Sequence, residues 1–97
     1  MATYIALANF TDQGIRNVQD TTKRSDAVGK AAKKFGVTMK QIFWTMGSYD
    51  MVVVFEAKDD VSMTAFGLAI GKAGNVRTET LRAFSKDEMK AILAKLA

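Results

Sequence analysis

The 97-residue chain contains neither cysteine nor histidine. Without cysteine it can form no disulfide, and it has no thiolate to act as a nucleophile or a metal ligand. Without histidine it lacks the commonest general base and the commonest ligand of transition metals. Any chemistry must therefore use carboxylates, Lys, Arg, Tyr, Trp or a borrowed cofactor. The sequence predicts no metal site, no cofactor and no identifiable catalytic residue.

Long apolar runs are also missing. The amino terminus, MATYIALANF, lacks the basic region, long apolar core and small-residue cleavage site of a signal peptide. The most apolar later window, MTAFGLAIGKAG, is too short to cross a bilayer. We therefore expect a cytoplasmic protein with no membrane partner.

The excess of positive charge is small. The chain has 14 Lys and Arg residues against 10 Asp and Glu residues, a formal net charge of +4, and the basic residues are spread along it. A nucleic-acid-binding surface gathers basic residues among aromatic ones. The nearest cluster is Lys30, Lys33 and Lys34, which is typical of a solvated helix face. The sequence therefore argues against a nucleic-acid partner.

What the chain does contain is typical of one globular domain over residues 1–97, with 48% apolar and 25% charged residues. No repeat, low-complexity tract or linker divides it. Strands are predicted over 3–10, 37–46, 49–56 and 75–84, and helices over 11–20, 22–35, 59–74 and from Ser85 to the end. This βαββαβ order with an extra C-terminal helix is that of a ferredoxin-like α+β fold, with two helices on one face of an antiparallel sheet.

The other face of this sheet is predicted to be apolar as well. The third strand places Met51, Val53 and Phe55 on one side and Val52 and Val54 on the other. The first strand is also apolar on both alternating sets. An antiparallel sheet with one wet face would alternate apolar and polar residues. We therefore expect two copies of the chain to pack sheet to sheet, as a homodimer or a larger homo-oligomer.

A hairpin turn is predicted at Gly47-Ser48, because glycine adopts the positive φ that a type II′ turn demands. In that register Thr45 faces Asp50. An acid is disfavoured at the start of so apolar a strand. Either the Asp50 carboxylate accepts hydrogen bonds from backbone N–H groups, Thr45 or an arginine, or it is a polar handle in a pocket between subunits.

Three segments, TYIALANFTDQGIRNV, FWTMGSYDMVVVFEAKDD and GNVRTETLRAF, closely resemble the small bacterial GYD-domain proteins, which are named for a Gly-Tyr-Asp signature. This chain inserts Ser48 into that signature. The resemblance implies a dimeric α+β barrel and assigns no reaction. The same hairpin also resembles the effector-binding domain of leucine-responsive-type transcription regulators, whose separate DNA-binding domain this chain lacks.

Six residues are candidates for a ligand pocket. Arg77 and Glu79 lie two apart on one strand and so share a face. They form either a cross-strand ion pair or solvated edge, or a pair that orients a polar ligand inside a cavity. Trp44 is either a core or interface anchor or a catalytic group, and Tyr49 is either a packing ring or a ligand donor. The full set is Asn9, Trp44, Tyr49, Asp50, Arg77 and Glu79.

Two classes of function remain open. The favoured one is a homo-oligomeric module that binds a small molecule or a protein partner. It fits the missing His and Cys and the surplus C-terminal helix, whose apolar stripe could dock onto a neighbour; the stripe is Met89, Ile92, Leu93 and Leu96.

The alternative is a cofactor-independent monooxygenase or isomerase that acts on a small aromatic substrate in the barrel cavity. Some oxygenases of the barrel group that the chain resembles use Asn, Trp, Tyr and Arg without metal or flavin. The matching residues here are Asn9, Trp44, Tyr49 and Arg77. An enzyme predicts that these side chains converge in a closed cavity. A structural module predicts a filled interior with Arg77 and Glu79 paired at its rim.

Overall fold

A computed structural model describes residues 1–96, so Ala97, the last residue of the predicted domain, lies outside the described residues. The elements are β1 (Ala2–Phe10), α1 (Asp12–Arg16), the short 3-10 helix η1 (Val18–Asp20), α2 (Thr21–Lys34), β2 (Val37–Trp44), β3 (Met51–Ala57), α3 (Asp60–Ala73), β4 (Val76–Ala83) and α4 (Lys86–Ala94). The predicted ferredoxin-like α+β order with a C-terminal helix is confirmed.

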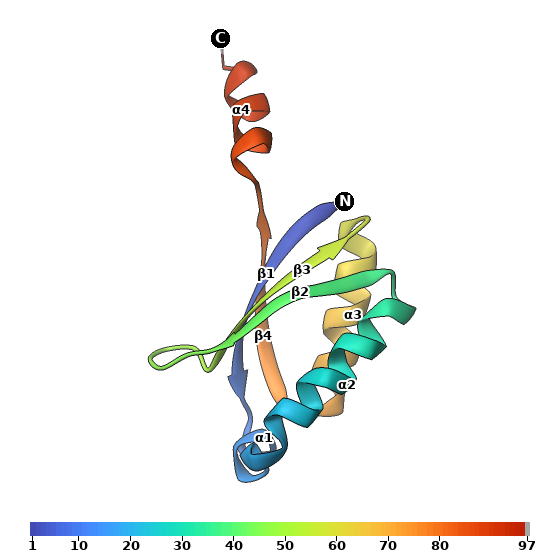
Figure 1. Ribbon diagram of the computed structural model, residues 1–97, viewed down its shortest axis with the longest axis vertical. Coiled ribbons are helices and arrows are strands. Elements are labelled where there is room, and N and C mark those ends of the chain that lie inside the picture. The colour runs from blue at the N-terminus through green and yellow to red at the C-terminus, as the bar shows by residue number, and fades with distance from the viewer. Residues whose placement is uncertain (97) are drawn as a thin grey trace.

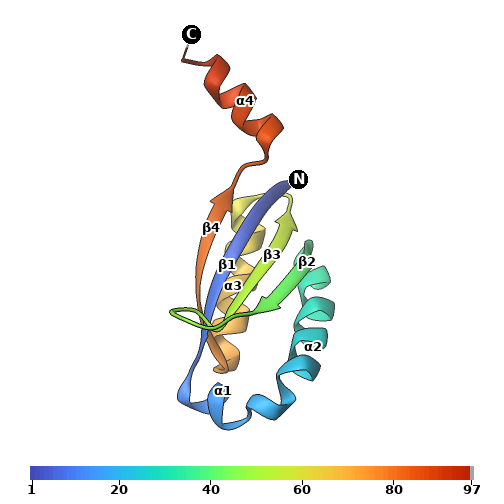
Figure 2. The ribbon, with the colours of Figure 1, turned by 60° about the vertical axis from the view of Figure 1, so that its left-hand side comes forward.

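The four strands form one antiparallel sheet in the order β2-β3-β1-β4. Helices α2 and α3 both lie on the same side of this sheet (Figure 1). The opposite side faces away from both of them (Figure 2), and we call it the open face. Helix α4 follows β4 and extends beyond the end of the sheet, away from the other helices (Figure 1).

Local capping signals explain where several helices begin and end. The Asp59 side chain accepts a hydrogen bond from the Ser62 N–H at 2.8 Å, which starts α3. Gly74 ends that helix at a φ of +90°, in the left-handed region that glycine adopts without strain. Ser85 and Glu88 form the predicted capping box at the start of α4.

The single helix predicted over residues 11–20 is wrong, because α1 ends at Arg16 and η1 follows it. Asn17 leaves the helical region with φ −110° and ψ 29°. Its carbonyl accepts a hydrogen bond from Arg24 Nη1 at 2.8 Å, so a side chain from α2 takes the acceptor that a continuing helix would use.

Gly14 is packed so tightly that a Cβ there would lie 2.0 Å from the Asn75 carbonyl oxygen. Only glycine fits at this contact.

The predicted hairpin register is confirmed, although both strands are shorter than predicted. Trp44 pairs with Met51, and the Thr45 N–H donates to the Asp50 carbonyl at 2.8 Å. Gly47 has the expected positive φ, at +104°. Residues 45–50 form a loop beyond the last ladder pair, so β2 ends earlier and β3 begins later than predicted.

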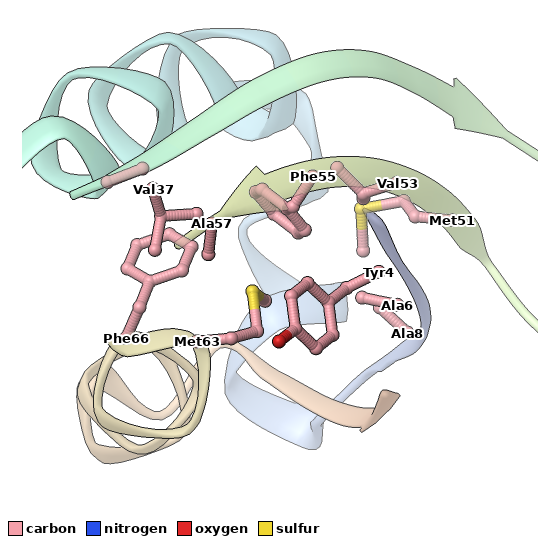
Figure 3. Close-up of a cluster of buried hydrophobic side chains, with 11 residues drawn as sticks. Tyr4, Ala6, Ala8, Val37, Met51, Val53, Phe55, Ala57, Met63 and Phe66 are labelled. Atoms are coloured by element: carbon pink, nitrogen blue, oxygen red, sulfur yellow. The ribbon is translucent and has the colours of Figure 1, made fainter. Parts of the chain in front are cut away.

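The buried core lies between the sheet and the two helices. Phe66 of α3 meets Phe55 of β3 edge-on with ring centroids 5.4 Å apart, and Phe35 lies 5.8 Å away from the Phe66 ring. Figure 3 shows Phe66 near one end of the cluster, whereas the β1 side presents the small side chains Ala6 and Ala8. The core is therefore filled unevenly along the sheet.

Candidate functional site

The open face carries an apolar centre. On it Ile5 lies between Val54 and Leu81, and Leu7 lies between Val52 and Glu79. Phe43 of β2 flanks Val52 from the other side. Phe43 is 53% exposed and Leu81 is 43% exposed. The apolar side chains of this face are Ile5, Leu7, Phe43, Val52, Val54 and Leu81.

Asp50 extends the β1–β3 ladder past the end of β3. Its Oδ2 accepts a hydrogen bond from the Phe10 N–H at 2.9 Å. Its own N–H donates to the Ala8 carbonyl, also at 2.9 Å. The carboxylate replaces a backbone acceptor at the point where the strands diverge, which is the anchoring interpretation of this residue. It explains why an acid stands before so apolar a strand.

Tyr49 and Glu79 meet at one end of the open face. The Tyr49 hydroxyl donates to Glu79 Oε1 at 3.2 Å. Since β1 lies between β3 and β4, the Tyr49 side chain must cross β1 to reach that carboxylate. The negative charge of Glu79 raises the pKa of Tyr49, and the hydrogen bond between them adds to the effect.

The Arg77–Glu79 pair predicted for a structural module is not formed, because each side chain has another partner. Arg77 Nη1 donates to the Gly71 carbonyl at 3.2 Å, near the end of α3. Within residues 1–96 the ion pairs are Lys40–Glu56 and Arg82–Glu88. Arg77 therefore fastens the edge strand to the helix layer, while Asn9, its partner across the ladder, stays half-buried.

Trp44 lies at the same end of the sheet as the other candidates, but on the opposite face from Asn9, Arg77 and Glu79. It is 41% exposed, and its indole N–H donates to the Thr21 hydroxyl at 3.1 Å, at the start of α2. Its ladder partner Met51 faces the core, so Trp44 stands on the helix side of the sheet. Asn9, Tyr49, Asp50, Arg77 and Glu79 lie at that same end, and the Tyr49 side chain reaches Glu79 on the open face. A ligand-binding role for the six stays a prediction.

Sequence reasoning missed a cavity between the sheet and the two helices. Its volume is about 110 Å³, and mostly apolar side chains line it. Ala6 and Ala8 line it from β1, Val28 from α2 and Ile70 from α3. None of the six candidates is among the lining residues. The available signal was the pair of alanines at core positions of a strand, where larger side chains usually fill the interior.

A wider groove of about 490 Å³ lies beside the cavity, between α3 and β4. In it the Tyr4 hydroxyl donates to the Asp60 carboxylate. Burial, reinforced by that carboxylate, raises the pKa of Tyr4 to about 12. The Arg82 guanidinium lies 5.7 Å from the centre of the Tyr4 ring and also pairs with Glu88 at 3.4 Å.

The predicted apolar stripe of α4 is exposed along its whole length. Leu96, just after the helix, is 80% exposed, and Met89, Ile92 and Leu93 are also exposed. The Cα radius of gyration is 14.5 Å, whereas about 12.5 Å is typical of a compact chain of this length. The projecting helix accounts for the elongated outline in Figure 1. We call α4 with its flanking residues 84–96 the arm.

Among residues 1–96, every helix is too short or too polar to span a membrane. The same residues contain no cluster of three or more acidic side chains arranged to hold a metal ion.

Three comparisons place the chain among known proteins. A protein of Thermus thermophilus named "Glutamine synthetase and cystathionine beta-lyase binding protein" is 31% identical over 94 residues, which are 96% of this chain and 99% of that one. The crystal structure of TTHA0845 from Thermus thermophilus superposes with a TM-score of 0.57 at 25% identity, covering 88% of this chain and 95% of the other. The family model of the GYD domain matches residues 4–93. The chain therefore belongs to the GYD domain family, as its resemblance predicted.

Proposed function

We propose that the protein is a homo-oligomeric protein-interaction module of the cytoplasm. Residues 1–97 act as a single domain, a second copy covers the open face to form a dimeric α+β barrel, and the arm binds another protein. The observation that carries the proposal is the coexistence of two separate apolar surfaces, the open face and the arm, on one small chain. Such surfaces on a small protein mark sites of association.

The open face suits a second copy of itself. Its apolar centre is bordered by charges of both signs, with the Lys40–Glu56 pair at one end and Glu79 at the other. Across a two-fold axis each patch meets its own copy, so unlike charges can face each other. Burying an exposed side chain such as Phe43 or Leu81 contributes about 1.5–3 kcal/mol.

The arm suits an apolar groove on a different protein. A helix of this length is marginal in water unless something packs against it. Yet Ser85 and Glu88 cap α4 well, and its apolar residues fall on one side. An amphipathic helix with that pattern is a common ligand for grooves on folded proteins. The relative named as a binding protein of two enzymes points to a folded metabolic enzyme as the partner.

The arm can be tested with the glutamine synthetase and the cystathionine beta-lyase of the source organism. We expect the wild-type protein to bind at least one of them at micromolar concentrations in isothermal titration calorimetry. The double variant Ile92→Asp, Leu93→Asp should weaken binding at least about tenfold, because it places charge in the apolar contact. The matched control Ala91→Asp adds a carboxylate to the opposite side of α4 and should bind like the wild type.

Two outcomes would overturn the proposed role of the arm. One is that neither enzyme binds the wild-type protein. The other is that Ala91→Asp loses as much affinity as the double variant, which would assign the effect to charge rather than to the apolar stripe. Sedimentation of every variant shows whether self-association is unchanged.

Small-ligand binding by the six candidate residues remains a second part of the proposal. Tyr49 and Glu79 already share a hydrogen bond at the border of the open face, and Asn9 and Arg77 lie next to them. If two copies pack sheet to sheet, these groups would lie at the border of the dimer interface. The alternative, a cofactor-independent monooxygenase or isomerase, needs Asn9, Trp44, Tyr49 and Arg77 in one closed cavity. The observed separation of Trp44 from the other three favours the binding module.

A further inference from the structure

The cavity between the sheet and the helices has no part in the proposed protein-interaction role. Its size, about 110 Å³, is slightly below that of an engineered apolar cavity of about 150 Å³ that accepts benzene. Protein interiors are packed densely, and unfilled space in a core is destabilising. A domain of 97 residues that keeps such a space next to Ala6 and Ala8 gives up stability for it.

The cavity and the groove adjoin at Gly67. Four residues line both the cavity and the wider groove, so the two spaces adjoin there; they are Met63, Gly67, Thr78 and Thr80. A Cβ added at Gly67 would meet no atom within 4 Å outside its own helix and chain neighbours. Any other side chain on this face of α3 would project into the junction between α3 and β4. The missing side chain thus leaves a passage from the groove to the cavity.

The groove outside this passage has a mixed polar and apolar lining and is balanced in charge. Thr64, Thr78 and Thr80 bring hydroxyl groups that can donate and accept hydrogen bonds, and the Tyr4 hydroxyl, which donates to Asp60, can still accept one. Its two charged residues, Asp60 and Arg82, have opposite signs. Arg82 is already engaged by Glu88 at 3.4 Å and by the Thr3 carbonyl at 3.3 Å. The groove therefore favours a neutral, hydrogen-bonding group over a strongly charged one.

We infer that the cavity and groove form a binding site for a small amphipathic molecule, entered past Gly67. The ligand class is a single six-membered ring, or an alkyl group of similar size, that carries a short arm with a neutral polar head. The ring occupies the cavity beside Ala6 and Ala8, and the head lies in the groove near Thr78 and Thr80. Met63 and Tyr4, drawn in Figure 3, form the inner wall of the groove.

The probe 2-phenylethanol has this composition, with one ring and one hydroxyl group. We expect it to bind the wild-type chain in the millimolar range, as suits a ligand of so few atoms. In a two-dimensional amide NMR titration the largest shifts should fall on Ala6, Ala8, Thr78 and Thr80. Phenylacetate, which differs in carrying a carboxylate, should bind less tightly.

A variant at the entrance separates this site from adventitious binding. Gly67→Leu places a side chain in the passage and should weaken 2-phenylethanol binding at least about tenfold. Ala65→Leu adds bulk to the opposite side of α3 and should leave binding within about twofold of wild type. Gly67→Ala adds one methyl group to open space, improves helix propensity and should give an intermediate loss. It keeps the test decisive if the leucine variant does not fold.

Three results would overturn the inference. The first is that 2-phenylethanol causes no shift at the cavity residues up to its solubility limit. The second is that the shifts fall on open-face residues such as Leu7 and Val52. The third is that Gly67→Ala and a folded Gly67→Leu both bind the probe as tightly as Ala65→Leu does. Tighter binding of phenylacetate would overturn the assignment of a neutral head.

Discussion

The two faces of the sheet are similarly apolar and yet differ in what covers them. On the helix side Tyr4 and Phe55 are almost fully buried, because α2 and α3 lie over them. On the open face, Phe43 and Leu81 remain exposed, whereas the residues next to them on their strands face the helices. Apolar patterning therefore shows which faces of a sheet carry apolar side chains. It does not show whether an element of the same chain packs against each face.

The largest expected effect comes from breaking the covered face. Phe66 is 1% exposed and packs against both Phe35 and Phe55. Phe66→Ala should lower the free energy of unfolding by about 3–5 kcal/mol, through lost burial and the cavity left behind. Urea denaturation followed by circular dichroism measures the change. A loss below about 1 kcal/mol would show that the covered face is not the stabilising core.

Breaking the open face should act on association instead. Leu81→Lys is expected to weaken self-association by about a hundredfold, equivalent to about 2.7 kcal/mol. Sedimentation velocity at micromolar concentration should then show a shift from dimer to monomer. Val61→Lys makes the same kind of change at an exposed position of α3 and should leave the dimer intact. A wild-type chain that sediments as a stable monomer would contradict the proposed pairing.

The stability of the covered face should depend on pH through Tyr4. Tyr4, on the covered face, has its pKa raised to about 12 by burial and by Asp60. The folded protein keeps that proton between pH 10 and 12, whereas the unfolded chain loses it at about pH 10. The associated stability is therefore present below pH 10 and is lost as the pH rises towards 12.

Tyr4→Phe should flatten this decline, because phenylalanine has no proton to lose. Urea denaturation of the two proteins at pH 9, 10 and 11 measures the difference. The phenolate absorbance of Tyr4 should also develop at higher pH than that of a free tyrosine. Equal slopes for the two proteins would show that the Tyr4 hydroxyl is not buried against Asp60.

The smallest expected effect concerns Asp50, at the end of the sheet where β1 ends and β3 begins. Asp50→Ala removes the acceptor of the Phe10 N–H and should cost about 1.5–2 kcal/mol. Asp50→Asn keeps an uncharged acceptor and should cost less. Amide hydrogen exchange at Phe10 measures the local effect, and exchange at Ile5, in the middle of β1, is the internal control. Unchanged protection of Phe10 in Asp50→Ala would contradict the anchoring role.

Local signals carried most of what the sequence predicted correctly. The capping box of Ser85 and Glu88 and the positive φ of Gly47 depend on neighbours a few residues away. The family resemblance rested on motifs along most of the chain and was confirmed over residues 4–93. These features do not require knowledge of how the layers pack.

The features that were missed depend on long-range placement. Trp44 bonds to Thr21 and Arg77 bonds to Gly71 only because strand ends and helix ends meet in the folded chain. The cavity beside Ala6 and Ala8 depends on how far α2 and α3 stand from the sheet, which no periodicity encodes. Asp50 was predicted in part. Its place before an apolar strand suggested an anchoring role, but its partner, the Phe10 N–H, comes from a strand distant in sequence.

In the proposed assembly, the position of the arm affects how tightly the protein can bind its target. A pair of copies joined through their open faces carries two arms, so it is bivalent. Many metabolic enzymes are symmetric and present the same groove more than once. Once one arm has bound such an enzyme, the second faces a high local concentration of identical grooves, and avidity can exceed single-arm affinity by about 10²–10⁴. A weak helix contact would then suffice for a long-lived complex.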